Sequence, residues 1–211
     1  MTYRLLYLSL RGRGEPIRWI LKALELEYEE ESIDLFSEWP SRKEDFEWQQ
    51  TPVLEVDGER LGQTTVICRF LGEKHKLAVE DPWTATRQQE AVEYLHDVSG
   101  MAASAFYFRL MQDDTAKEFY MKKLRERLPV VVKNIEGRVT DEAGWILSPE
   151  MTWVDLFVAC CLDQYEAMVE GLLDEAPKLQ ELLARVRCLY PIQTWIEERP
   201  PPHKFEDPED L

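Results

Sequence analysis

The sequence of 211 residues predicts an α/β domain followed by an all-helical domain. In the first third, short apolar runs typical of strands alternate with helical patterns. An Asp57-Gly58 pair between two such runs indicates a β-hairpin. Beyond Asp81 the strand signals stop and long helical periods replace them. A chain of this length can bury the cores of two such domains without disulfide bonds.

The first elements form a strand, a helix and a strand. Residues 4–9 form a buried strand, and a helix begins at Glu15, where Pro16 lacks only an N–H that has no helical partner. Its apolar stripe consists of Ile17, Ile20, Leu21 and Leu24. A more exposed strand covers residues 27–33. This order favours a parallel pair of strands joined by a right-handed crossover.

An irregular polar stretch, residues 36–50, separates this unit from the hairpin, which begins at Pro52. Thr64 or Thr65 is expected to cap the next helix. Its apolar face carries Val66, Ile67, Phe70 and Leu71, and it ends near His75. We place the first domain at residues 1–78, a linker at 78–82 and the helical domain at 83–211.

In the helical domain, one long helix carries Met101, Ala105 and Phe108 on one face. The next helix should be kinked or broken at Pro129. Thr152 and Asp155 fit a capping box at the head of an apolar run. Two short helices follow near residues 179–186 and 191–198. The tail, residues 200–211, is rich in proline and acid, which predicts an extended or mobile end.

Composition excludes several classes of function. The net charge of −16 argues against nucleic acid as a partner, because a polyanion needs a basic surface. No apolar run reaches the roughly 18 residues that span a bilayer, so no membrane association is expected. The N-terminus shows no secretory leader, which predicts a cytoplasmic protein. Three scattered histidines indicate no metal site, and the four cysteines, without CxxC spacing, are expected to be small core side chains: Cys68, Cys160, Cys161 and Cys188.

Several motifs occur together in an order that resembles the cytosolic glutathione transferases, and the sigma class in particular. They are Tyr7 at a strand end, Arg11–Arg18, Trp39-Pro40 with Lys43, Thr51–Gly58, Gln63-Thr64 before residues 67–72, and Thr152–Leu156. Residues 195–200 are similar to the C-terminal ends of arthropod sigma-class members. The resemblance covers nearly the whole chain and implies a thioredoxin-like N-terminal domain, βαβ-ββα, with an all-α C-terminal domain. Two departures are Thr64, where the family usually has serine, and the loop of residues 48–51.

The resemblance implies that glutathione is the co-substrate, that no metal is required, and that Tyr7 and Arg13 are catalytic. A free thiol has a pKa near 8.5, so at neutral pH only a small fraction is the nucleophilic thiolate. A neutral tyrosine hydroxyl can donate a hydrogen bond to that sulfur. Arg13 would raise the local positive potential and support Tyr7. From the residues alone, however, a tyrosine such as Tyr7 is more often an aromatic that packs in a strand than a catalyst.

The implied glutathione contacts come from the first domain and from a partner subunit. Trp39 and Lys43 would bind the glycyl end, whereas Gln63 and Thr64 would hold the γ-glutamyl carboxylate at a helix N-terminus. Asp97 would reach the glutathione of the neighbouring subunit, which implies a homodimer, although a solvated charge is the plainer interpretation. The full set is Tyr7, Arg13, Trp39, Lys43, Gln50, a cis Pro52, Val53, Gln63, Thr64 and Asp97.

A hydrophobic electrophile is expected between the first strand and the first long helix of the second domain. The residues proposed to line its site are Leu8, Leu10, Met101, Ser104, Ala105 and Phe108, although a helix face such as that of Met101, Ala105 and Phe108 is usually core. Three activities remain open. The first is conjugation of glutathione to electrophiles or reduction of lipid hydroperoxides; the second is a prostaglandin D synthase-like isomerisation. The third is a non-catalytic role like that of the S-crystallins, against which the retained binding residues argue.

Overall fold

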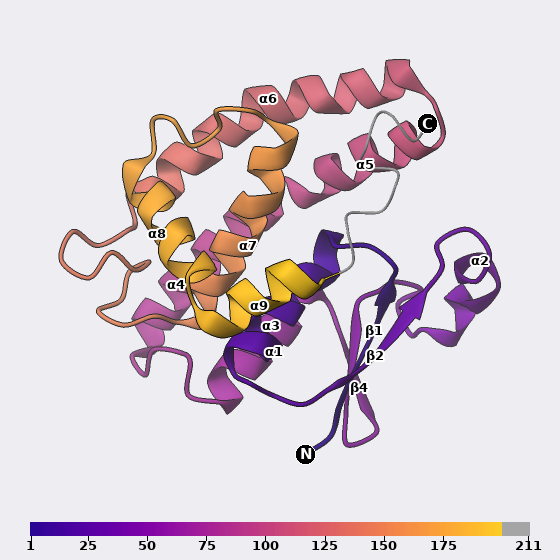
Figure 1. The fold of residues 1–211 in the computed structure, drawn as a ribbon, viewed down its shortest axis with the longest axis horizontal. Coiled ribbons are helices and arrows are strands. Elements are labelled where there is room, and N and C mark those ends of the chain that lie inside the picture. Colours follow the sequence, from indigo (N-terminus) through magenta and orange to yellow (C-terminus); the bar gives the residue numbers. More distant parts are fainter. Residues whose placement is uncertain (200–211) are drawn as a thin grey trace.

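The computed structural model describes residues 1–199 (Figure 1). Its N-terminal part contains a four-stranded sheet in the order β2-β1-β3-β4. β1 pairs in parallel with β2 and antiparallel with β3, and β3 pairs antiparallel with β4, so the parallel pair and the hairpin are confirmed. The strands are β1 (Tyr3–Leu8), β2 (Glu29–Ile33), β3 (Val53–Val56) and β4 (Glu59–Gly62).

Helices α1 (Glu15–Ala23) and α3 (Thr64–Lys74) pack together on the side of the sheet that faces the helical domain. The predicted start of α1 is confirmed, and most of its apolar stripe is fully buried. The predicted cap of α3 is wrong, because Gln63 is the N-cap residue and both threonines lie inside the helix. Val66 is exposed, since the buried face of α3 instead runs through Ile67, Cys68 and Leu71.

Residues 36–50 are less irregular than their sequence indicates. They contain α2 (Trp39–Arg42) and a 3-10 turn at Lys43–Asp45, and a second 3-10 turn, Gly12–Gly14, leads into α1. Segments of three or four residues are too short to display an apolar period. The short elements near the predicted site therefore could not be read from the sequence pattern.

The chain passes through residues 75–81 into the helical part. The predicted helix that carries Met101, Ala105 and Phe108 is α5, and a separate helix, α4, precedes it and ends at His96. Of the kink or break expected at Pro129, the break is absent, because α6 continues through this residue. In Figure 1, α5 and α6 lie side by side and project away from the rest of this part. The helices are α4 (Pro82–His96), α5 (Ser99–Leu110), α6 (Asp114–Glu136), α7 (Trp153–Met168), α8 (Pro177–Arg187) and α9 (Tyr190–Glu198).

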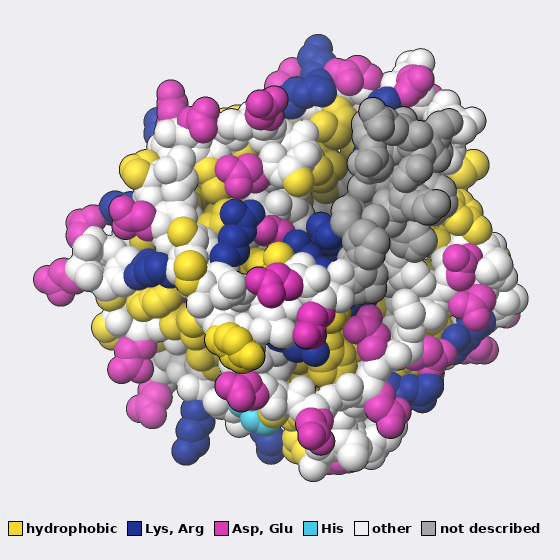
Figure 2. All heavy atoms as spheres, in the orientation of Figure 1, with side chains coloured by type: hydrophobic (Ala, Val, Ile, Leu, Met, Phe, Trp, Pro, Cys, Tyr) yellow, Lys and Arg dark blue, Asp and Glu magenta, His cyan; other side chains and the backbone are white. Residues whose placement is uncertain are grey.

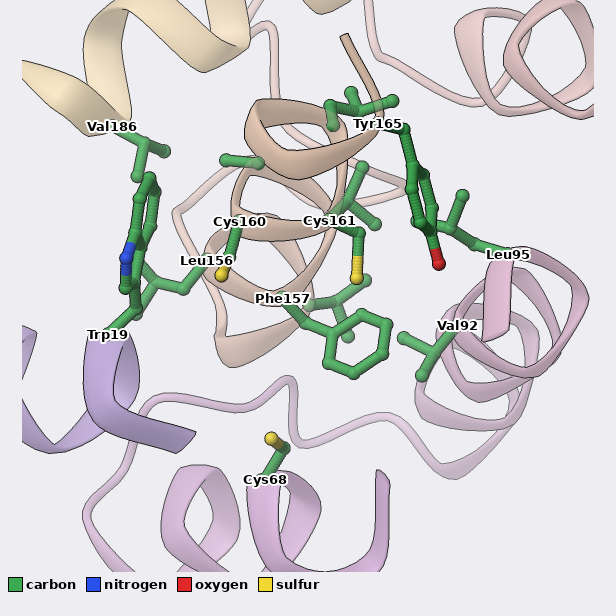
Figure 3. Close-up of a cluster of buried hydrophobic side chains, with 14 of the residues drawn as sticks. Trp19, Cys68, Val92, Leu95, Leu156, Phe157, Cys160, Cys161, Tyr165 and Val186 are labelled. Atoms are coloured by element: carbon green, nitrogen blue, oxygen red, sulfur yellow. The ribbon is translucent and has the colours of Figure 1, made fainter. Parts of the chain in front are cut away.

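Helix α7 lies at the centre of the main core, which is continuous between the two parts of the chain. Figure 3 shows side chains from α1, α3, α4 and α8 around it, among them Trp19 and Cys68. The capping box of Thr152 and Asp155 at the start of α7 is confirmed. Cys188 is exposed at the end of α8, so its assignment to the core is wrong, whereas the other three cysteines are buried.

The surface agrees with the acidic composition. Figure 2 shows acidic side chains scattered over the described part of one face, with several basic side chains near its middle. None of the helices within residues 1–199 combines the length and the apolar character needed to cross a membrane. The predicted tail, residues 200–211, lies outside the described residues.

Candidate functional site

The hydroxyl of Tyr7 is held by backbone at the end of β1. Tyr7 is 5% exposed, and its oxygen accepts a hydrogen bond from the backbone N–H of Arg13 at 2.9 Å. Burial raises the pKa of Tyr7, although this hydrogen bond and the charge of Arg18 work against the rise. The phenol is therefore neutral at pH 7. Within residues 1–199 its own hydrogen has no acceptor, so it is free to be donated to a ligand.

Two glycines make room for the Tyr7 ring. A Cβ on Gly14 would overlap the ring, at 2.7 Å from its Cγ, and a Cβ on Gly12 would lie 2.7 Å from the hydroxyl oxygen. Gly12 also has a φ of 39°, a left-handed conformation that side chains rarely adopt. The Gly-Arg-Gly sequence thus lets the loop wrap closely around Tyr7 and brings the N–H of Arg13 to its hydroxyl.

We expect Gly14→Ala to destabilise the protein by about 1–3 kcal/mol and to lower activity, because the added methyl must displace the Tyr7 ring from a packed site. Thermal unfolding and the steady-state rate would measure both effects. Gly137→Ala is the matched control, since a Cβ there meets no atom closer than 3.8 Å. If Gly14→Ala matched this control in both measurements, the close packing around Tyr7 would contribute neither to stability nor to activity.

The side chain of Arg13 provides a positive charge that the rest of the site does not neutralise. Its Nε is buried without a hydrogen-bond partner among the described residues, and so is that of Arg11. A buried donor without a partner is costly unless a ligand satisfies it. Burial lowers the pKa of nearby His96, and the charge of Arg13 lowers it further. Because His96 is neutral, the charge that favours an anionic ligand here is that of Arg13.

A hollow opens beside Arg13, between the loop before β3 and the start of α3. The Thr51–Pro52 peptide bond at its edge is cis, as expected. Val53 is not among its lining residues; it is paired with Leu6 on one side and with Gly62 on the other. The lining residues are Arg13, Trp48, Gln50, Thr51, Pro52, Gly62, Gln63, Thr64 and His96.

Polar side chains connect the walls of this hollow. Gln63 adopts a φ of 70° and donates from its side-chain amide to the Gln50 side chain at 3.3 Å. The Thr64 hydroxyl donates to the backbone carbonyl of Arg13 at 3.1 Å. The Thr64 hydroxyl hydrogen is therefore used within the protein, and what α3 offers a ligand at this end is its backbone N–H groups and dipole.

Besides Tyr7 and Val53, three predicted glutathione contacts lie outside the lining of the hollow. The Trp39 ring packs against Phe46, with ring centroids 5.3 Å apart, and covers a small second core. Lys43 is exposed and forms no ion pair with another described residue. Asp97 is exposed where α4 ends, one residue after His96, and likewise has no ion-pair partner among residues 1–199.

The predicted electrophile site is partly filled by protein contacts. Leu8, Leu10 and Met101 are half-buried against the main core, and Ala105 is buried. The Ser104 hydroxyl donates to the Gly100 carbonyl of its own helix at 2.8 Å. Phe108 stacks on Tyr120 of α6, with ring centroids 5.6 Å apart. This stacking brings Tyr120, which sequence reasoning missed, to the predicted wall.

Sequence reasoning also missed Thr51, Trp48, Gly62 and His96 in the hollow. The position of Thr51 directly before the proline could have indicated its role, whereas nothing in the sequence distinguished His96 from other helix residues.

A larger hollow of about 600 Å³ lies between α9 and the residues that join α1 to β2, and none of residues 7–14 lines it. Residues 1–199 contain no group of three His, Cys, Asp or Glu side chains that could hold a metal ion.

Each of the two parts of the chain matches a known protein family. Residues 4–73 match the family described as the N-terminal domain of glutathione S-transferase, and residues 96–199 match its C-terminal domain. Glutathione S-transferase S1 of Drosophila melanogaster is 31% identical over 94% of this chain and 79% of its own length. The hematopoietic prostaglandin D synthase of Mus musculus is 30% identical over 94% of this chain and 97% of its own. The solved structure of prostaglandin synthase D of Nilaparvata lugens superposes with a TM-score of 0.84 at 28% identity, covering 95% of this chain and all of that one.

Proposed function

This chain belongs to the glutathione S-transferase family, and from that premise we propose that it activates glutathione through Tyr7 and transfers its sulfur to hydrophobic electrophiles. Glutathione is the co-substrate of the family. The observation that carries the proposal is the hydroxyl of Tyr7, which accepts the Arg13 N–H and keeps its own hydrogen for a ligand. Donation of that hydrogen to sulfur stabilises the thiolate over the thiol.

We propose that the hollow beside Arg13 binds the γ-glutamyl part of glutathione. The N-terminal end of α3 and the Arg13 guanidinium favour its carboxylate. The backbone of Thr51, rather than that of Val53, is the better candidate to pair with the cysteinyl unit, because Val53 already has a strand on each side. Lys43 has a free ammonium for the glycyl carboxylate, with Trp39 beside it on α2.

The rest of the predicted site is proposed on the same basis. The N-terminal domain, residues 1–78, holds glutathione, and the helical domain, residues 83–211, holds the electrophile against α5. Tyr120 extends that wall through its stacking on Phe108. Because Asp97 is exposed and unpaired among the described residues, it is available to a glutathione amine bound in a second subunit. We therefore also propose a homodimer, and we propose that it is cytoplasmic.

Binding and turnover test the proposal. We expect isothermal titration calorimetry to detect binding of both glutathione and S-methylglutathione, because most contacts do not involve the sulfur hydrogen. Only glutathione should react with a chlorodinitrobenzene-type electrophile. Absence of binding for both ligands would refute the glutathione site, and binding without any turnover would favour the S-crystallin-like alternative.

A prostaglandin D synthase-like isomerisation is a second candidate, favoured by the 30% identity with the mouse enzyme. It would use the same glutathione contacts and differ only in the second substrate. Product analysis with the endoperoxide substrate separates the two activities, since isomerisation regenerates glutathione and conjugation consumes it.

The proposed dimer can be tested on the same material. We expect light scattering to give the mass of two chains, and Asp97→Asn to weaken glutathione binding without changing that mass. Asp113→Asn at the exposed start of α6 is the control for loss of one acidic charge. A monomer with full glutathione affinity would contradict the role of Asp97 across the interface.

A further inference from the structure

A network of buried charged side chains joins the start of α1 to the end of α9. At its centre is Glu15, 1% exposed and two residues beyond Arg13. Its Oε1 accepts the indole N–H of Trp195 at 2.9 Å and an N–H of Arg199 at 2.9 Å. Burial by itself would raise the pKa of Glu15, but Arg18, Trp195 and Arg199 outweigh it and hold the pKa below its usual value. Glu15 is therefore ionised at neutral pH.

Arg18 connects this carboxylate to the catalytic loop, residues 9–14, which lies between β1 and α1. Its Nη1 donates to Oε2 of Glu15 at 3.0 Å and to the backbone carbonyl of Leu10 at 2.8 Å. Its Nε donates to Glu30 of β2 at 2.9 Å. The guanidinium carbon also lies 5.5 Å from the centroid of the Tyr7 ring. One buried cation thus contacts both the segment between Tyr7 and Arg13 and the face of the Tyr7 ring.

The positive and negative charges of this network nearly cancel. The net electrostatic potential that it produces at Tyr7 therefore changes when any one charge is removed. Glu15 and Glu30 are balanced by Arg18 and Arg199, and Arg199 also lies 3.5 Å from Asp163 of α7. A cation over a phenol ring strengthens the hydroxyl as a donor, and a nearby carboxylate weakens it. If one cation is removed from a buried cluster, the excess negative charge acts across a medium of low dielectric constant.

We propose that Arg199, at the end of α9, is a positioning residue for Tyr7, acting through Glu15 and Arg18 to set how strongly the Tyr7 hydroxyl donates to the glutathione sulfur. This inference rests on the role proposed for Tyr7. It extends the site beyond the first domain, because α9 belongs to the helical part of the chain. In Figure 1, α9 crosses over α1, the helix that follows the catalytic loop.

Other titratable groups also lie near this path, among them Tyr28, whose pKa is raised by burial and by Glu30. The backbone N–H groups of Arg13 and Gly14 and the charges of Arg13 and Arg18 act directly on Tyr7. From α7, Asp163 is held by Arg187, and the buried Cys160 thiol, whose pKa burial raises, stays neutral. The charges to change in a test of this path are therefore those of Glu15 and Arg199.

The test compares three network variants with the wild type and a control. Arg199→Met removes the cation, Arg199→Lys restores a charge, and Glu15→Gln removes the anion. Arg125→Met, which breaks an exposed ion pair with Glu118 on α6, is the matched control. The readout is the pKa of the bound glutathione thiol, measured from the ultraviolet absorbance of its thiolate, together with the pH profile of kcat/KM.

We expect Arg199→Met to raise that thiol pKa by about half a unit to one unit, and Glu15→Gln to lower it by a similar amount. Arg199→Lys should return most of the shift, and Arg125→Met should cause none. Opposite signs for the two charge removals identify an electrostatic path, because loosened packing alone would impair both variants in the same direction. Should Glu15→Gln fail to fold, the comparison of Arg199→Met with Arg199→Lys decides the question.

An unchanged thiol pKa in a folded Arg199→Met protein would overturn the inference. If the wild type bound no glutathione, the proposed function would fail instead, and the coupling would be measured without ligand. In that case the ¹³Cζ chemical shift of Tyr7, assigned with Tyr7→Phe, should change in Arg199→Met and stay constant in Arg125→Met. A constant shift in both variants would refute the path independently of glutathione.

Discussion

Tyr7→Phe should lower the rate of conjugation at neutral pH by roughly 10- to 150-fold while leaving glutathione binding nearly intact. The variant loses one hydrogen bond to a charged acceptor, which contributes about 1.5–3 kcal/mol, and each 1.36 kcal/mol corresponds to a tenfold change in rate. The ring remains, so the space enclosed by Gly12 and Gly14 stays filled. Steady-state kinetics at pH 6.5–9 and calorimetry of glutathione binding measure the two effects.

The deficit of Tyr7→Phe should shrink as the pH rises, because a thiol with a pKa near 8.5 ionises without help above that pH. Tyr3→Phe is the matched control. Tyr3 is also a buried β1 tyrosine, but its hydroxyl lies 2.8 Å from Nε2 of His75 instead of the Arg13 N–H. Equal neutral-pH rates for Tyr7→Phe and the wild type would remove the hydroxyl from the mechanism.

Asp155→Ala should destabilise the protein by roughly 2–5 kcal/mol. Asp155 is fully buried, and its carboxylate accepts the backbone N–H of Ile146 at 2.8 Å and that of Thr152 at 2.7 Å. Removal leaves two buried donors unsatisfied, each of which costs about 1–3 kcal/mol. Asp81→Ala is the control, because Asp81 caps α4 in the same way but is exposed, so water can replace it.

The effect of Asp155→Ala should also depend on pH. Burial raises the pKa of Asp155 to about 6, above the value near 3.9 of an unfolded aspartate. The folded protein therefore binds this proton more tightly, and the stabilisation is fully present below pH 4 and lost as the pH rises through 6. The loss on substitution should be about 1 kcal/mol larger at pH 5 than at pH 7.5. Urea unfolding at both pH values measures it, and a pH-independent difference would show that folding does not shift this carboxyl.

Local sequence patterns predicted the elements that are stabilised by interactions between residues close together in the sequence. The apolar stripe of α1, the Asp57-Gly58 hairpin and the Thr152–Asp155 capping box depend on residues within four positions of one another, so the pattern alone was sufficient. The family motifs added Tyr7, Arg13 and the cis peptide at Pro52, and the structure shows the first two joined and that peptide cis. Pattern failed where an element was too short, as at α2, or where packing chose the face, as at Val66.

By itself, the sequence determined the order of the longer strands and helices and the place of Tyr7 at a strand end, whereas the close fit of Gly12 and Gly14 around the Tyr7 ring came from the structure. Only the tertiary structure decided which distant groups surround that loop. Glu15 and Arg199 are 184 positions apart, and His96 approaches Arg13 from another helix. The physical reason is that periodicity reports which face of an element is buried, whereas the partner of a buried charge is set by how whole helices pack.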